Sequence, residues 1–597
     1  MVLSVVSCKT AEKTSTTTPT TTKPSAVATT PSPSPVTGTS APAPTTTPAV
    51  TGSPPPTSTP ATATGQAKWW EKYGKPKYGG VLNYRVASLS PIWDVGDWRG
   101  RNVQLQYESI WDHDWTVPPE VHPFRFIFVP VDYQTGRLAK SWEWKDPTNL
   151  VVYLREGIRW QNKPPLNGRE MTAYDVEFRF DRLLGTGSGY DKPEPMHVGR
   201  TGNLEKVTAL DKYTVNFKFS RAAAMNIYVL LEPSNQNYII PPELIKPGEA
   251  ITDPAKAIGT GPWMITEVVE GSVATYDKNP DYWGYDERWP GNKLPYFDQI
   301  KFVCIPDLQT ALAALRTAKI DLMDAVTDWR LVEQLGKSNP EIKRIPLPGP
   351  GPSISLRVDR SPFNDLRVRK ALQMSIDREA IAASFYGGTV KPVPCAIIHP
   401  EAKGYNFPYE EWPDSLKEEY RYNIAAARKL LTEAGYPNGF KTNCVASGET
   451  SLLEVMKAYF LDIGVDMEIK MYEATAFMQI INQRKHDQMR WDGAGRSGAD
   501  APPFMAAKMY AANTAPNENM VNDPVYEDLL KKMENAVTLD ELKSAIREAD
   551  KYAISQHWSI TTFPINRYNL YQPNVRGLEE RRLPPNPGWQ FARMWKE

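Results

Sequence analysis

The alternation of apolar and polar residues is clearest between residues 136 and 184. Leu150 to Leu154 is a short run of β-branched and apolar residues, which predicts a strand, and Gly157 marks the turn after it. Thr172 and Asp175 have the spacing of a capping box, which predicts that a helix begins there. Residues at helical spacing then form one apolar stripe along this helix. The stripe consists of Val176, Phe180, Leu183 and Leu184.

The same alternation of strand and helix recurs later in the chain. Residues 295–326 predict a strand over Ile300 to Ile305, then a helix, then a second strand that starts at Ile320. Strands that alternate with helices indicate an α/β architecture. Further helices are expected after Asn364 or Asp365 and after Asp377, Asn423 and Thr538, because each of these residues is a good N-cap.

The first part of the chain has a different composition. Thr10 to Gly65 consists almost entirely of Thr, Pro, Ser, Ala and Gly, which cannot bury enough apolar surface to offset the entropy of ordering. We therefore expect residues 9–77 to be a disordered linker that spans about 40 Å on average. Val5 to Cys8 resembles the end of a bacterial lipobox, so residues 1–8 are interpreted as the remnant of a lipoprotein signal with Cys8 as the lipidated residue. The charged and apolar regions of such a signal do not precede Cys8, and an accidental cysteine in a disordered tail is the alternative.

Composition excludes several classes of function. Lys+Arg and Asp+Glu both total 69, so the chain lacks the basic surplus that nucleic acid binding needs. The four cysteines form no C-x-x-C pair, the six histidines form no i,i+4 pair, and no nucleophile–base pattern is present. We therefore expect no metal, no cofactor and no enzymatic activity. The G-x-G-x-x-G at residues 493–498 is not interpreted as a dinucleotide motif, because Ala-Asp-Ala-Pro-Pro follows it and no helix can begin there.

Several ordered motifs resemble the signature of the family 5 extracellular solute-binding proteins, the peptide- and nickel-binding subunits of ABC importers. The central motif runs from Leu138-Ala139 and Trp142 through Tyr153 to Trp160 and Gly168 to Thr172–Val176. A second hallmark of the family matches Pro362 to Leu372. The resemblance extends over residues 78–597 through shorter matches at Gly79–Tyr84, Gly259–Trp263, Asn279–Gly284 and Asn423–Gly435.

This resemblance implies a type II periplasmic-binding-protein fold with three lobes. Lobe I is expected to combine residues 78–112, 203–345 and 560–597, lobe II residues 113–202, and lobe III residues 346–559. Two crossings between lobes I and III, near Pro346–Pro352 and Ser555–Thr562, are expected to act as hinges.

The resemblance also implies a function and a location. The expected role is the extracytoplasmic component of an ABC importer, which captures an oligopeptide or another medium-sized polar organic solute and delivers it to a permease and ATPase complex. The protein would be a monomer, anchored by lipid at the outer face of the cytoplasmic membrane or in the periplasm. A solute-sensing or scaffold lipoprotein of the same fold without a transporter is the alternative. A sugar oligomer, a nickel chelate and other organic acids also remain open as ligands.

The loop after the predicted strand at Met489–Trp491 is the most informative segment for ligand binding. In peptide-binding members of the family, the equivalent loop carries an Asp that pairs with the peptide amino terminus, and this Asp falls on Ser497 here, beside Arg496. An arginine favours a carboxylate, phosphate or hydroxyl-rich ligand, whereas an ion pair within the loop is the alternative. Arg357 stands where many members have Asn, and the same alternative applies to it. The predicted ligand-binding residues are Trp93, Trp111, Trp115, Arg357, Trp491, Arg496, Ser497 and Asp500.

Overall fold

The fold was analysed in a computed structural model. It describes residues 68–95, 105–125, 128–194, 201–231, 237–395, 397–493, 502–512, 514, 517–578 and 587–597. All of them belong to one of the two units of the chain, Ser53–Glu597. Cys8 and residues 9–67 of the predicted linker lie outside the described residues.

The last residues of the predicted linker have regular structure. Trp69–Tyr73 form a 3-10 helix, η1, and the indole N–H of Trp69 donates to the Thr116 carbonyl at 3.0 Å. Two tryptophans and a tyrosine give this short segment apolar surface that the Thr/Pro/Ser-rich sequence before it lacks. Regular structure is therefore present before the predicted boundary at residue 78.

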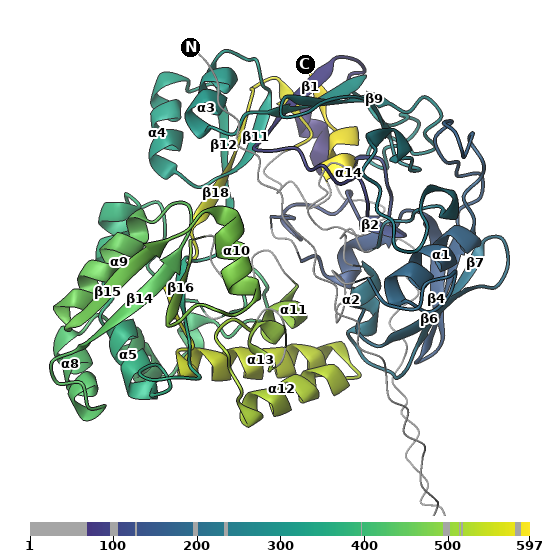
Figure 1. Cartoon of the computed structure of the whole chain (residues 1–597). Helices are drawn as coiled ribbons and strands as arrows, with labels where there is room; N and C mark the ends of the chain where they lie inside the picture. The colour runs from purple at the N-terminus through teal and green to yellow at the C-terminus, as the bar shows by residue number, and fades with distance from the viewer. Residues whose placement is uncertain are drawn as a thin grey trace, which may run out of the picture. The chain divides into compact units, whose positions relative to one another are not determined.

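Lobe I contains a seven-stranded sheet with the order β12-β18-β11-β1-β10-β9-β8 (Figure 1). β1 pairs in parallel with both β10 and β11, and helix α3 connects the latter two strands. The βαβ unit predicted over residues 295–326 is thus confirmed. The strands are β1 Val81–Val86, β8 Trp263–Val269, β9 Val273–Lys278, β10 Gln299–Cys304, β11 Leu322–Val326, β12 Lys343–Pro348 and β18 Asn566–Tyr571. The helices of this lobe are α3 Leu308–Arg316, α4 Trp329–Ser338 and α14 Pro587–Ala592, and β19 Val575–Arg576 pairs with β20 Trp595–Lys596.

Lobe II contains a four-stranded antiparallel sheet that packs against α1. The capping box of Thr172 and Asp175 is present at the start of α1, as predicted. The strand pairing places residues 204–219, which were expected in lobe I, in this sheet, because Phe217 lies opposite Leu150 and shares its core. Pairing likewise places residues 346–348 in the sheet of lobe I and residues 560–561 in that of lobe III, each across a predicted boundary. The elements are β4 Ala139–Asp146, β5 Asn149–Leu154, β6 Leu204–Ala209, β7 Thr214–Phe219, α1 Ala173–Leu184 and α2 Asn226–Leu231, with β2 Trp111–His113 pairing with β3 Gln134–Gly136 beside them.

Lobe III contains a five-stranded sheet with the order β15-β14-β16-β13-β17. Side chains of α5 and α9 share a hydrophobic core with one face of this sheet, and α10 packs against Val445 on the other (Figure 1). The strands are β13 Ser353–Leu356, β14 Phe440–Ala446, β15 Val465–Met471, β16 Met489–Asp492 and β17 Ser559–Thr561. The helices are α5 Leu366–Met374, α6 Arg378–Ala380, α7 Asp414–Tyr420, α8 Ile424–Glu433, α9 Ser451–Asp462, α10 Ala474–Asn482, α11 Pro503–Ala507, α12 Pro524–Asn535 and α13 Leu539–Gln556. The predicted N-caps Asp365, Asp377, Asn423 and Thr538 all accept backbone N–H groups.

The chain passes twice between lobe I and lobe III, at residues 349–352 and 562–565. These two crossings lie side by side, because the Gly349 N–H donates to the Ile565 carbonyl at 2.9 Å and the Thr562 N–H donates to the Pro352 carbonyl at 3.2 Å. A Cβ atom at Gly351 would lie 2.7 Å from the Phe563 carbonyl oxygen, so only glycine allows this approach. The first crossing lies within the predicted range, and the second begins where the other predicted range ends.

Candidate functional site

Both large sheets direct the carboxyl ends of their parallel strands toward the crossings. In lobe I, β12 runs into the first crossing, and the pairings give β11, β1 and β10 the same direction. In lobe III, β17 runs into the second crossing, and β16, β14 and β15 run with it. Ligands of open α/β sheets bind outside the carboxyl ends of the strands. The candidate site therefore lies where these two strand-end edges face the crossings.

Trp491 lies at this edge of lobe III, in β16, but its side chain is only 3% exposed. Its indole N–H donates to the Glu449 carbonyl at 3.0 Å, and its ring belongs to the core that also contains Ile354. Trp491 thus packs in the core of lobe III, and a role in ligand binding stays a prediction. The loop that follows begins at Gly493, as predicted, and Arg496, Ser497 and Asp500 lie outside the described residues.

Arg357 lies in lobe III and is buried. Its guanidinium donates to both carboxylate oxygens of Asp359 at 2.8 Å and to the backbone carbonyls of Arg484 and His486 at 3.0 and 2.8 Å. Burial raises the pKa of Asp359, but the hydrogen bonds from Arg357 and the positive charges of Arg357 and Arg360 together lower that pKa below its ordinary value. This arrangement matches the ion pair that the sequence leaves open as an alternative, and a role for Arg357 in binding stays a prediction.

The other three predicted tryptophans are also buried. The backbone N–H of Trp93 donates to the Ile251 carbonyl at 2.8 Å. Trp111, in β2, packs edge-on against Trp142 with ring centroids 5.9 Å apart, and its indole belongs to the core shared with lobe II. Trp115 donates its indole N–H to Asp112 at 3.3 Å. Trp111 and Trp115 thus lie close together beside lobe II, whereas Trp491 and Arg357 lie in lobe III.

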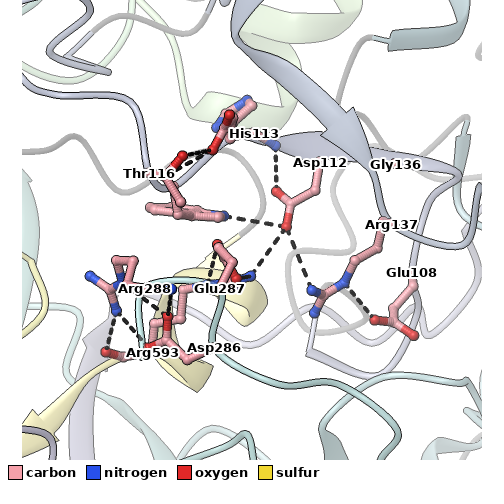
Figure 2. A network of polar contacts seen from close by, with 12 residues as sticks. Glu108, Asp112, His113, Thr116, Gly136, Arg137, Asp286, Glu287, Arg288 and Arg593 are labelled. Atoms are coloured by element: carbon pink, nitrogen blue, oxygen red, sulfur yellow. Dashed lines mark hydrogen bonds and ion pairs between the residues drawn. The ribbon is translucent and has the colours of Figure 1, made fainter. Parts of the chain in front are cut away.

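Asp112, which accepts the Trp115 indole N–H, belongs to a buried network of charged side chains (Figure 2). Arg137 binds Glu108 at 2.9 Å and lies 3.9 Å from Asp112. Arg593, from the residues after α14, also lies 3.9 Å from Asp112 and has its guanidinium 5.2 Å from the centre of the Trp115 ring. Burial raises the pKa of Asp112, and the two guanidinium groups oppose this shift.

The network extends to the loop between β9 and β10. Arg593 also binds Glu287 at 2.9 Å, and Arg288 binds Asp286 at 3.1 Å (Figure 2). Tyr282 donates its hydroxyl proton to Glu108 at 2.8 Å. These contacts connect β2, the loop before β10 and the chain's C-terminal segment, so the network fixes the Trp111–Trp115 segment against lobe I.

The chemistry available in the network is electrostatic and structural. Arginine and carboxylate groups satisfy one another there, so the geometry supports positioning rather than group transfer. Among the described residues, no group of three or more His, Cys, Asp and Glu side chains has the arrangement of a metal site. Sequence reasoning missed this network, because its members come from segments that lie far apart in the sequence, around residues 108–137, at residues 282–288 and at Arg593.

Comparison with known proteins gives a consistent result. The model of the "Bacterial extracellular solute-binding proteins, family 5 Middle" matches residues 134–516, which is more than half of the chain. Di/tripeptide-binding protein 1 of Pseudomonas aeruginosa is 24% identical over 476 residues, which cover 75% of this chain and 83% of that protein. Heme-binding protein A of Haemophilus influenzae is 23% identical over 475 residues, 74% of this chain and 80% of that protein.

A solved structure shows the same fold. The periplasmic binding protein DppA of Helicobacter pylori, in complex with the peptide STSA, superposes with a TM-score of 0.68 at 22% identity and covers 87% of this chain and 99% of its own. Among the residues that the structure describes, none of the helices has the length and apolar composition that crossing a membrane requires. With the family match and the strand-end geometry, the chain belongs to the family 5 bacterial extracellular solute-binding proteins, the substrate-binding subunits of ABC importers.

Proposed function

We propose that this chain captures a peptide, or another polar organic solute of similar size, between lobes I and III and delivers it to the permease of an ABC importer. The observation that carries the proposal is the pair of adjacent crossings toward which both sheets direct the carboxyl ends of their parallel strands. A ligand that contacts both edges stabilises the closed arrangement of the lobes, because only that arrangement offers both sets of contacts at once.

The relatives support a peptide-sized ligand. The P. aeruginosa relative is a di/tripeptide-binding protein, and the H. pylori structure contains a tetrapeptide. The H. influenzae relative is a heme-binding protein, so the same architecture accepts ligands other than peptides. We extend the proposal to a lipid anchor at Cys8 and a flexible linker, which would hold a monomeric protein at the outer face of the cytoplasmic membrane.

The test starts from the ligand that the protein acquires in its own cell. Native mass spectrometry of the purified full chain identifies a bound solute by mass, and calorimetry with alanine di-, tri- and tetrapeptides measures affinity directly. X-ray scattering with and without the bound peptide should show a smaller radius of gyration in the bound state, because the lobes close.

Two variants locate the site within the chain. Arg496→Ala should weaken binding, because the loop after β16 follows the strand-end edge of lobe III. Arg421→Ala, on an exposed side chain of the same lobe, is the matched control and should bind as the wild type does. If no peptide or co-purified solute changes either the heat of mixing or the scattering curve, the proposed function is wrong.

A further inference from the structure

Three strands of lobe III bring one row of polar side chains to the candidate site. Ser353, the first residue of β13, lies directly opposite Asp492 of β16 on one side and opposite Thr561 of β17 on the other. Directly opposed residues of antiparallel strands present their side chains on the same face, with Cβ atoms about 5 Å apart. Asp492, Ser353 and Thr561 therefore form a row across the sheet, which we call the strand-end row.

The row lies on the polar face of the sheet. The next residues along the strands, Ile354, Trp491 and Ile560, point to the opposite face and belong to the hydrophobic core. Ser559 lies two residues before Thr561 and therefore shares the face of the row. Its hydroxyl is satisfied there, since the Tyr510 hydroxyl lies 2.9 Å away and the Asn519 amide donates to it at 3.2 Å.

The hydroxyls of the strand-end row differ from that of Ser559. The Oγ of Ser353 and the Oγ1 of Thr561 are both buried, and neither has a hydrogen-bond partner among the described residues. Ser353 is only 1% exposed. The backbone of Thr561 is held firmly, because its N–H donates to the Gln373 side chain at 3.3 Å and its carbonyl accepts from Arg378 at 2.8 Å. The unsatisfied groups are therefore the two hydroxyls, in strands that are otherwise fixed.

We propose that the Ser353 and Thr561 hydroxyls are the subsite of lobe III that hydrogen-bonds the main chain of a bound peptide. This inference rests on the proposed function, and it specifies which groups of the peptide the site binds. A hydroxyl donates to a carbonyl oxygen and accepts from an N–H, so a pair of them suits the alternating groups of an extended peptide. Such contacts do not depend on the side chains of the ligand, as binding of varied peptides requires.

The position of the row supports this role. Ser353 and Thr561 are the residues next to the two crossings, where the Thr562 hydroxyl donates to the Pro352 carbonyl at 2.7 Å. A buried hydroxyl without a partner destabilises the unliganded protein, and binding sites retain groups of this kind because the ligand satisfies them. The strand-end row thus lies next to both crossings and contains two hydroxyls that have no hydrogen-bond partner among the described residues.

The test compares stability and affinity in the same variants. Ser353→Ala and Thr561→Val each remove one hydroxyl, and both should leave the unfolding temperature of the ligand-free full chain unchanged or raised. Each should weaken the binding of tri-alanine by about fivefold to tenfold, as expected for the loss of one hydrogen bond. Ser559→Ala is the matched control: it removes a satisfied hydroxyl from the same face, so it should lower stability and leave affinity within twofold of the wild type.

A tri-alanine analogue with methylated amide nitrogens gives a second readout. If the hydroxyls contact peptide amides, the two variants should discriminate less than the wild type between this analogue and tri-alanine. The inference is overturned if wild-type chain binds tri-alanine and both variants bind it within twofold of the wild type, or if both variants lose stability as Ser559→Ala does. Failure of the wild type to bind any alanine peptide would also overturn the inference, because main-chain contacts do not depend on side chains, whereas the proposed function fails only if no peptide or co-purified solute binds.

Discussion

Asp550 provides a sharp test of how burial acts on a charged group in lobe III. It lies in α13 and is fully buried. Its Oδ1 accepts the Ile398 N–H at 3.0 Å, and its Oδ2 accepts the Phe407 N–H at 2.8 Å. One carboxyl group thus links α13 to the segment from Ile398 to Phe407. Desolvation raises the pKa of Asp550 to about 7, although the backbone hydrogen bonds work in the opposite direction.

The sign of the resulting pH dependence follows from the two pKa values. In the unfolded chain Asp550 should titrate near the ordinary value of about 3.9. Between about pH 4 and pH 7 the folded protein therefore holds a proton that the unfolded chain releases. The free energy of unfolding must then fall as the pH rises through this window, by at most about 1.4 kcal/mol per pH unit. The rise of the Asp550 pKa from its ordinary value to about 7 corresponds to a total of about 4 kcal/mol, and the pH dependence ends above the folded pKa.

Urea unfolding of wild type and Asp550→Asn at about pH 5, 6, 7 and 8 measures this effect. The asparagine cannot titrate, and its amide group replaces an acceptor, so at about pH 5 the variant should be less stable by about 1–3 kcal/mol. This gap should close or reverse toward about pH 8, because only the wild type then has a buried charge. Asp365→Asn, at a partly exposed helix N-cap, is the control and should not show a closing gap. A gap that stays constant or widens with pH would show that Asp550 is ionised in the folded protein, against this reasoning.

Two further substitutions test the crossings and the contacts between the lobes. Gly351→Ala should destabilise the chain by about 1–3 kcal/mol and weaken ligand binding. The new Cβ would lie 2.7 Å from the Phe563 carbonyl oxygen and push the crossings apart. Thermal unfolding measures the loss of stability, and calorimetry measures the loss of affinity. Tyr405→Phe should lower the free energy of unfolding by about 1 kcal/mol, because the Tyr405 and Tyr228 hydroxyls lie 3.1 Å apart in a buried contact between lobes III and II. Tyr422 is exposed, so Tyr422→Phe should leave stability unchanged. If Tyr228→Phe and Tyr405→Phe have strictly additive effects on unfolding, the two hydroxyls do not interact.

Local features of the fold were predictable from the sequence. The capping box of Thr172 and Asp175 and the N-cap at Asn423 are present where the sequence places them. The strand expected at Ile300–Ile305 is found at Gln299–Cys304. These features depend on residues within one or two turns of one another, so a pattern in the sequence contains all the information that they need.

Contacts between distant segments were not predictable in the same way. Residues 204–219 join the sheet of lobe II because β7 pairs with β5, and an alternating strand pattern does not reveal its partner. The sequence could also not decide which aromatic residues face a ligand. The four predicted tryptophans are all buried against protein groups, because a tryptophan suits a core as well as a binding surface, and a role in ligand binding stays a prediction for each of them.

The proposed subsite separates affinity from closure. Ser353 and Thr561 are one peptide bond away from Pro352 and Thr562, which hold the crossings together, but both hydroxyls lie in one sheet of lobe III. A ligand shifts a conformational equilibrium only through contacts that differ between the two states. The two hydroxyls offer the same contacts at every hinge angle, so they hold the peptide on lobe III, and contacts with lobe I favour the closed arrangement. Loss of either hydroxyl should therefore weaken the affinity and leave the closure seen by scattering at saturating tri-alanine unchanged.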